Sequence, residues 1–133
     1  MKRMLITTII ILFCFRAWCP VEKVLYIEKP SQISYYEPLI IAITWVESRG
    51  YELALNITEQ AVGPMQIRQC RINHYNQLTG ANYKLEDCFD YEVSRKVFLY
   101  FAQGKTYERA ARSWNGSGPM TKVYWNRVKK QLQ

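Results

Sequence analysis

Residues 43 to 67 read ITWVESRGYELALNITEQAVGPMQI, and this stretch decides the fold. One acidic residue, Glu47, stands at the end of an apolar run, and Gly50 follows as a helix terminator. The apolar run consists of Leu39, Ile40, Ile41, Ile43 and Val46. A carboxylate on such a helix either lies exposed on its flank or is buried with a raised pKa, which a general acid working near neutral pH requires.

The helix that carries Glu47 is predicted to run from Pro38 to about Ser48. Proline is favoured in the first turn of a helix, where its missing N–H is not needed. Ile43 and Val46 share one face, and Glu47 lies one turn beyond Ile43 on its flank. The negative end of the helix dipole makes ionisation of Glu47 harder still.

The N-terminus resembles an export signal. Lys2 and Arg3 precede an apolar run, residues 4 to 15, that is too short to span a bilayer but fits the core of a secretory signal. We therefore interpret residues 1 to 19 as a signal peptide or N-terminal anchor. Lipid attachment at Cys19 and an uncleaved anchor both remain open.

Beyond the signal, residues 20 to 36 are predicted to be a linker, and residues 37 to 133 a single domain, which is all that 133 residues comfortably allow. Cys70 and Cys88 then remain as a pair, and in an exported protein the simplest expectation is one disulfide, worth about 3 kcal/mol in the chain-entropy model. The alternative is two free thiols.

A formal charge of +7 suits an anionic polymer, either nucleic acid or bacterial wall material. Export argues against nucleic acid. The lone His74 has no second ligand at metal-binding spacing, so we expect no metal and no cofactor. We also expect a monomer.

The remaining chain is predicted to be mainly α-helical, with five or six helices and little or no sheet. Residues 51 to 62 form an irregular loop in this interpretation. The later helices are expected from Met65 to Leu78 before Gly80, from Asp90 to Gly104, from a Thr106 cap through Trp114, and from a Thr121 cap with Tyr124, Val128 and Leu132 facing inward.

Three motifs that are far apart in the sequence match the same protein family, in the same order. Glu47-Ser48, then Gly63-Pro64-Met65-Gln66-Ile67, then Ala111-Arg112-Ser113-Trp114-Asn115-Gly116 together resemble the catalytic domain of the soluble lytic transglycosylases, relatives of goose-type lysozyme. The resemblance covers residues 38 to 130 and includes Tyr124 in the last helix. It implies a lysozyme-like domain that acts on peptidoglycan.

The resemblance also assigns residues. Glu47 matches the single catalytic acid, and Ser48 the residue after it, with either substrate contact or a supporting role. Tyr124 matches a tyrosine that bonds the acid. Candidates for substrate binding are Gly63, Met65, Gln66, Trp114 and Asn115. Many family members also have a polar group before the glycine motif that orients the sugar acetamido group, and here Asn56 or Thr58 is nearest, with Asn56 preferred. Pro64 stands where the family usually has Leu, and Trp114 where it more often has Tyr. Without the resemblance, Trp114 and Tyr124 would be core aromatics.

The implied reaction cleaves the bond between N-acetylmuramic acid and N-acetylglucosamine and leaves a 1,6-anhydro end, with Glu47 serving as acid and then as base. A muramidase that uses water is the nearest rival, with Glu59, Glu52 or Asp87 positioning that water. A non-catalytic wall-binding or assembly protein is a third possibility. The sequence leaves open whether the partner is a secretion, conjugation or phage assembly.

Overall fold

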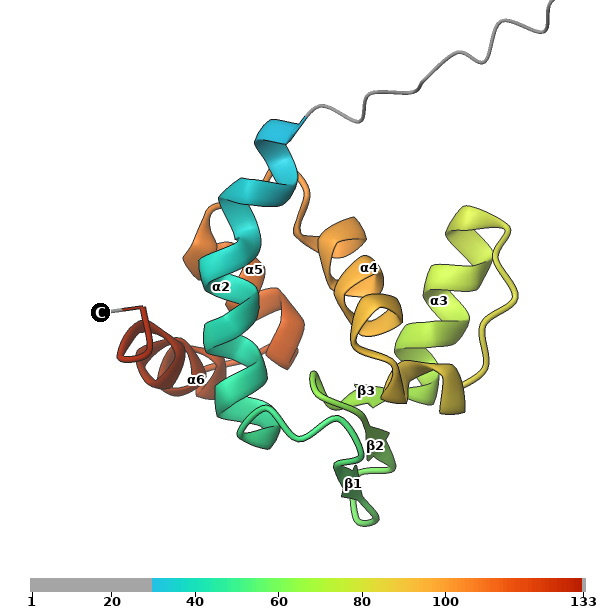
Figure 1. The fold of residues 1–133 in the computed structure, drawn as a ribbon. Helices are drawn as coiled ribbons and strands as arrows, with labels where there is room; N and C mark the ends of the chain where they lie inside the picture. Colours follow the sequence, from blue (N-terminus) through green and yellow to red (C-terminus); the bar gives the residue numbers. More distant parts are fainter. Residues whose placement is uncertain (1–29, 133) are drawn as a thin grey trace, which may run out of the picture.

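The structure, a computed structural model, describes residues 30–132 (Figure 1). The predicted signal, Cys14 and Cys19 lie outside these residues. The elements are the helices α2 (Pro30–Ser48), α3 (Gln69–Thr79), α4 (Tyr91–Ala102), α5 (Tyr107–Asn115) and α6 (Met120–Lys129), the 3-10 helix η1 (Glu86–Phe89), and the strands β1 (Leu55–Asn56), β2 (Ala61–Val62) and β3 (Ile67–Arg68). The prediction of a mainly helical protein with very little sheet is confirmed.

Helix α2 is the centre of the fold and packs against α4, α5 and α6. Its buried face carries Tyr36, Leu39, Ile40 and Ile43. The hydroxyl of Tyr36 donates to the carbonyl of Ala102 at 2.6 Å, which ties this helix to the end of α4. Burial of a continuous apolar face is the main source of stability for a helix of this kind.

The start of α2 differs from the prediction. The helix begins at Pro30, so Pro38 lies inside it and the end of the predicted linker is helical. A proline inside a helix removes one backbone hydrogen bond but does not have to end the helix. Here Tyr36 before the proline and Leu39 after it are both buried in the same core, and this packing keeps the helix continuous.

A small antiparallel sheet follows α2, in the order β1-β2-β3. Leu55 pairs with Val62, and Ala61 pairs with Arg68. The predictions of an irregular loop over residues 51 to 62 and of a helix from Met65 were wrong at this point. Strands of two residues are too short to show a period in the sequence, and the turn before β3 delays the start of α3 to Gln69.

The other helix boundaries follow local capping signals. Gly80 ends α3 in the left-handed conformation (φ 73°). The side chain of Thr106 accepts a hydrogen bond from the first turn of α5, as predicted. Asp90 was predicted as the first residue of its helix, and it instead caps α4 with its side chain. Thr121 is not a cap: α6 begins one residue before it, and its hydroxyl is buried and donates to the carbonyl of Gly118.

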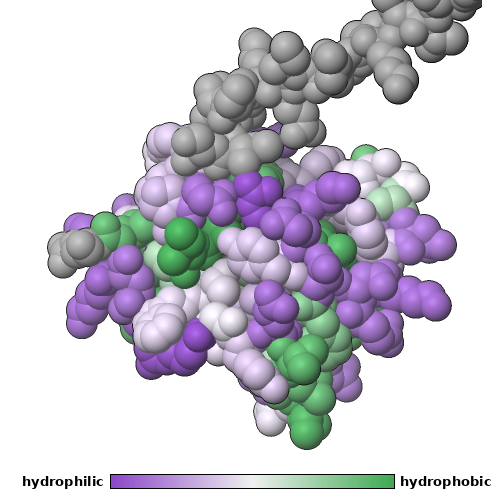
Figure 2. Space-filling view, in the orientation of Figure 1, coloured by the Kyte–Doolittle hydropathy of each residue, from purple (hydrophilic) through white to green (hydrophobic). Residues whose placement is uncertain are grey.

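Hydrophobic surface gathers at the end of the molecule where the β1–β2 hairpin lies (Figure 2). The exposed apolar side chains in this part of the sequence are Tyr51, Leu53, Leu55 and Ile57. Within residues 30–132, no helix has both the length and the apolar character needed to cross a bilayer.

Candidate active site

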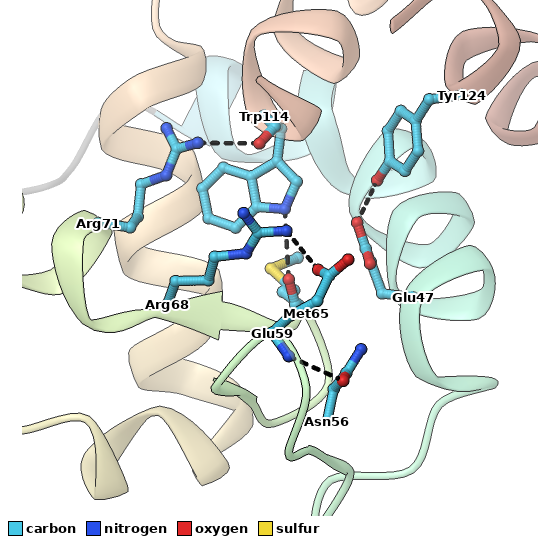
Figure 3. A network of polar contacts seen from close by, with 8 residues as sticks. All are labelled: Glu47, Asn56, Glu59, Met65, Arg68, Arg71, Trp114 and Tyr124. Carbon is cyan, nitrogen blue, oxygen red and sulfur yellow. Dashed lines mark hydrogen bonds and ion pairs between the residues drawn. The ribbon is translucent and has the colours of Figure 1, made fainter. Parts of the chain in front are cut away.

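Glu47 lies in the last turn of α2, with its side chain half-buried. Tyr124, from α6, is 6% exposed, and its hydroxyl donates a 2.6 Å hydrogen bond to Glu47 Oε1. Figure 3 shows the carboxyl group of Glu47 turned toward Tyr124 on one side and toward the small sheet on the other. Glu47 and Tyr124, which the sequence analysis singled out as an acid and its partner, are therefore in contact.

Burial raises the pKa of the Glu47 carboxyl group, and this is the largest influence on it. The hydrogen bond from Tyr124 acts in the opposite direction, because it stabilises the ionised form. The negative charge of Glu59 raises the pKa, and the positive charge of Arg68 lowers it. Since burial dominates, Glu47 holds its proton to a higher pH than an exposed glutamate does.

Glu59 and Arg68 form an ion pair on the sheet, facing Glu47 (Figure 3). Of the three carboxylates considered as rivals, Glu59 is the one whose charge acts on Glu47. Asp87 instead accepts from the backbone N–H of Lys84 at 2.8 Å, and Glu52 is exposed in the turn after α2. The sequence analysis did not identify Arg68 as a site residue. The one local indication of its position is that it follows Ile67, which is buried, so its own side chain points to the opposite face of the strand.

Gly63 allows the turn before β3 to form. Its φ is +77°, and a Cβ atom there would lie 1.9 Å from the carbonyl oxygen of Cys88. Only glycine fits both the backbone conformation and the space. Ser48 then fixes this turn to α2, because its hydroxyl donates to the carbonyl of Pro64 at 2.9 Å. This geometry gives Ser48 a supporting role.

Gln66 belongs to the same turn. Its side-chain nitrogen donates to the carbonyls of Gly63 at 3.0 Å and Ala54 at 3.3 Å. The side-chain nitrogen therefore holds the turn together, and contact of this amide with sugar groups stays a prediction. Gln66 itself adopts a positive φ of 49°, so the side-chain bonds accompany a strained backbone.

Trp114 and Met65 are both buried in the core and are bonded to each other. Met65 is fully buried, and its carbonyl accepts a 3.3 Å hydrogen bond from the indole N–H of Trp114. Arg71, which the sequence did not single out, lies over the Trp114 ring with its guanidinium carbon 4.7 Å from the ring centroid. It also donates to the Trp114 carbonyl at 2.8 Å. These contacts are packing and positioning contacts.

The two asparagines lie in different surroundings. The side-chain oxygen of Asn56 accepts from the backbone N–H of Glu59 at 3.1 Å, so Asn56 shapes the hairpin that carries Glu59. Asn115 is the last residue of α5 and is exposed. The structure thus places Asn56 beside the ion pair and Asn115 at the end of the helix that bears Trp114.

The predicted disulfide is not formed: Cys70 and Cys88 are both free thiols. Cys70 is exposed in the first turn of α3, whereas Cys88 is fully buried in η1, next to Gly63. Burial and two neighbouring carboxylates raise the pKa of the Cys88 thiol to about 12.

Two of the surface depressions among residues 30–132 are well formed, and Glu47 lines neither of them. One lies between α5 and α6, and the other includes the exposed side of α2 at Ile41 and Trp45. We define the candidate active site by the side chains that act on Glu47, which are Tyr124, Glu59 and Arg68. Among residues 30–132, no group of three potential metal ligands comes together.

Comparisons with protein-family models, with curated proteins and with solved structures returned no significant match.

Proposed function

We propose that this chain is a peptidoglycan lytic transglycosylase, which cleaves the β-1,4 bond between N-acetylmuramic acid and N-acetylglucosamine and leaves a 1,6-anhydro-muramyl end. The hydrogen bond from Tyr124 to Glu47 carries the proposal. It joins two of the matching positions from opposite ends of the domain, at an acid whose pKa is raised by burial. The net charge of +7 also suits an anionic wall polymer.

In this mechanism Glu47 is protonated at the start and gives its proton to the bridging oxygen as the bond from that oxygen to the muramyl C1 breaks. The substrate's own acetamido group stabilises the developing positive charge. Glu47, now a carboxylate, takes the proton of the muramyl 6-hydroxyl, whose oxygen bonds to C1. No water is consumed. One group acts as acid and then as base, so its pKa has to lie near the working pH.

Tyr124 has a defined part in this cycle. Its hydroxyl donates to Glu47 Oε1, and that bond is stronger when the carboxyl group is ionised. The tyrosine therefore stabilises the carboxylate that Glu47 becomes after it has given up its proton, and it leaves the other oxygen of Glu47 for the substrate. Burial raises the pKa of Tyr124, so this hydroxyl keeps its proton throughout.

A muramidase that uses water is the second candidate, and Glu59 is the observation that favours it. A hydrolase of this kind needs a second carboxylate near the first. Glu59 faces Glu47, but it is ion-paired with Arg68 and exposed. Digestion in H₂¹⁸O distinguishes the two reactions, because only hydrolysis places the heavy oxygen in the product.

The test of the proposal is turnover of purified peptidoglycan by Glu47→Gln, with Glu59→Gln as the matched control. We expect Glu47→Gln to lose at least about a thousandfold in rate, since it removes the proton that is transferred. Glu59→Gln should keep most of the activity. Equal lysis by the wild type and Glu47→Gln would leave a wall-binding or assembly protein as the better account.

Peptidoglycan lies outside the cytoplasm, so this function requires export. The apolar run of residues 4 to 15 is the candidate signal. A small wall-cleaving domain of this kind would serve a secretion, conjugation or phage assembly by opening the wall locally.

A further inference from the structure

A polar depression of about 460 Å³ lies between α5, the turn at residues 116 to 118, and the start of α6. Its lining contains no apolar side chain. The hydroxyl groups come from Thr106, Ser113, Ser117 and Thr121, and the charged groups from Glu108, Arg109 and Arg112. A site of this composition does not suit an apolar ligand, and it offers hydrogen-bond donors from two guanidinium groups.

Arg112 is held in place on two sides. Its Nε donates to Thr121 Oγ1 at 3.2 Å, and its Nη1 donates to Glu108 at 3.1 Å. Thr121 is 3% exposed, so one of these anchors belongs to the core. The second terminal nitrogen of Arg112 forms no hydrogen bond within residues 30–132. A fixed guanidinium with free donors loses little entropy when it binds an anion.

The positive charge in the depression exceeds the negative charge. Glu108 is the one acidic residue in the lining, and it is already paired with Arg112. Arg109 lies one turn before Arg112 on α5, and its side chain forms no ion pair among the described residues. Lys105 adds a third cation, because its Nζ donates to Ser113 Oγ at 3.1 Å.

We propose that this depression binds a carboxylate of the peptidoglycan stem peptide, with Arg109 and Arg112 as its ligands. Guanidinium groups bind planar carboxylates through paired hydrogen bonds. The location agrees with this role: Thr121 and Tyr124 lie on the same buried face of α6, about 4.5 Å apart along its axis. This inference rests on the proposed function, since it takes the peptide from the same wall polymer.

Binding is tested with the full chain and a soluble stem peptide, using calorimetry, with inorganic phosphate as a second probe. Arg109→Gln/Arg112→Gln should weaken peptide binding at least about tenfold. Arg127→Gln/Lys129→Gln, which also removes two positive charges but from exposed positions on α6, should leave it unchanged. Peptide affinity that is the same in the double variant and the wild type would overturn the proposal. So would phosphate binding as tightly as the peptide.

Turnover provides a second readout, which also reports whether the variants fold. The ratio of kcat/KM on peptide-bearing glycan to kcat/KM on glycan stripped of its peptides should fall about tenfold in the double variant. An unchanged ratio would contradict a peptide site. If the wild type cleaves neither glycan, the proposed function fails, while the calorimetric result still decides whether the depression binds the stem peptide.

Discussion

The hydroxyl of Tyr124 lies 2.6 Å from Glu47 Oε1, so a side chain of the last helix is bonded to the acid at the end of the first described helix. Among the described residues, Tyr124 is the only residue of α6 that forms a hydrogen bond with Glu47. The position of the tyrosine hydroxyl beside the acid therefore depends on the packing of α6 against α2.

Tyr124→Phe should lower turnover of peptidoglycan about 10- to 100-fold, the range expected for one hydrogen bond to a charged group. The bond lowers the pKa of Glu47, so removing it raises that pKa further. The acid must be protonated at the start of the reaction, so the alkaline limb of the pH–rate profile should move to higher pH. A limb that stays in place or moves to lower pH would contradict the assigned role.

Glu47 should also make the protein less stable as the pH rises. Its folded-state pKa is raised above the value of 4.5 for an exposed glutamate, so the folded state binds more protons than the unfolded state between those two values. Its contribution to stability is therefore present below pH 4.5 and is lost as the pH rises through the folded-state pKa.

Melting temperatures of the wild type and Glu47→Gln, measured from about pH 3 to pH 8, test this sign. The variant should gain stability relative to the wild type across that window. Glu52→Gln, at an exposed position after α2, is the control and should follow the wild type at every pH. If the melting temperature of the wild type instead rises relative to that of Glu47→Gln as the pH rises, Glu47 is stabilised in its ionised form.

Gly63→Ala should be among the most damaging single changes in the chain. The new Cβ would collide with the Cys88 carbonyl, and the positive φ adds a further penalty. We expect a loss of more than about 3 kcal/mol in unfolding free energy, by overpacking and backbone strain together. Gly104→Ala, with a φ of +70° and no atom within 4 Å, should cost only about 1 kcal/mol. Equal costs from denaturant titration would refute this explanation.

The free thiols predict a difference in reactivity. Iodoacetamide should modify exposed Cys70 in the folded protein, but buried Cys88 only after denaturation, because the thiolate is the reactive form and the pKa of Cys88 is about 12. Peptide mapping by mass spectrometry reads both sites. Protection of both residues until a reductant is added would restore the disulfide predicted from the sequence.

The sequence predicted best the elements that local signals determine. The helix start near Asp90, the cap at Thr106 and the terminator at Gly80 each depend on residues within one turn, so α4, α5 and the end of α3 could be placed to within about a residue. The start of α2 could not be placed, because a proline such as Pro38 is typical of the first turn of a helix. The helix continues on the N-terminal side of Pro38 because Tyr36 packs in the core, and the sequence does not show this packing.

The candidate site was only partly predictable for a similar reason. Glu47 and Tyr124 were paired through a family resemblance, since no local pattern links residues so far apart. Arg68 and Arg71 were missed because an isolated arginine gives no sign of what it will face after folding. The cysteine pairing failed because sequence spacing does not reveal that one thiol is buried and the other exposed.

The most direct test of the central claim is the mass of the glycan ends that the purified protein releases from peptidoglycan. A transglycosylase that depends on Glu47 gives muramyl ends one water lighter than reducing ends, and Glu47→Gln gives none. Reducing ends alone, or lighter ends from Glu47→Gln at the wild-type rate, would contradict the account.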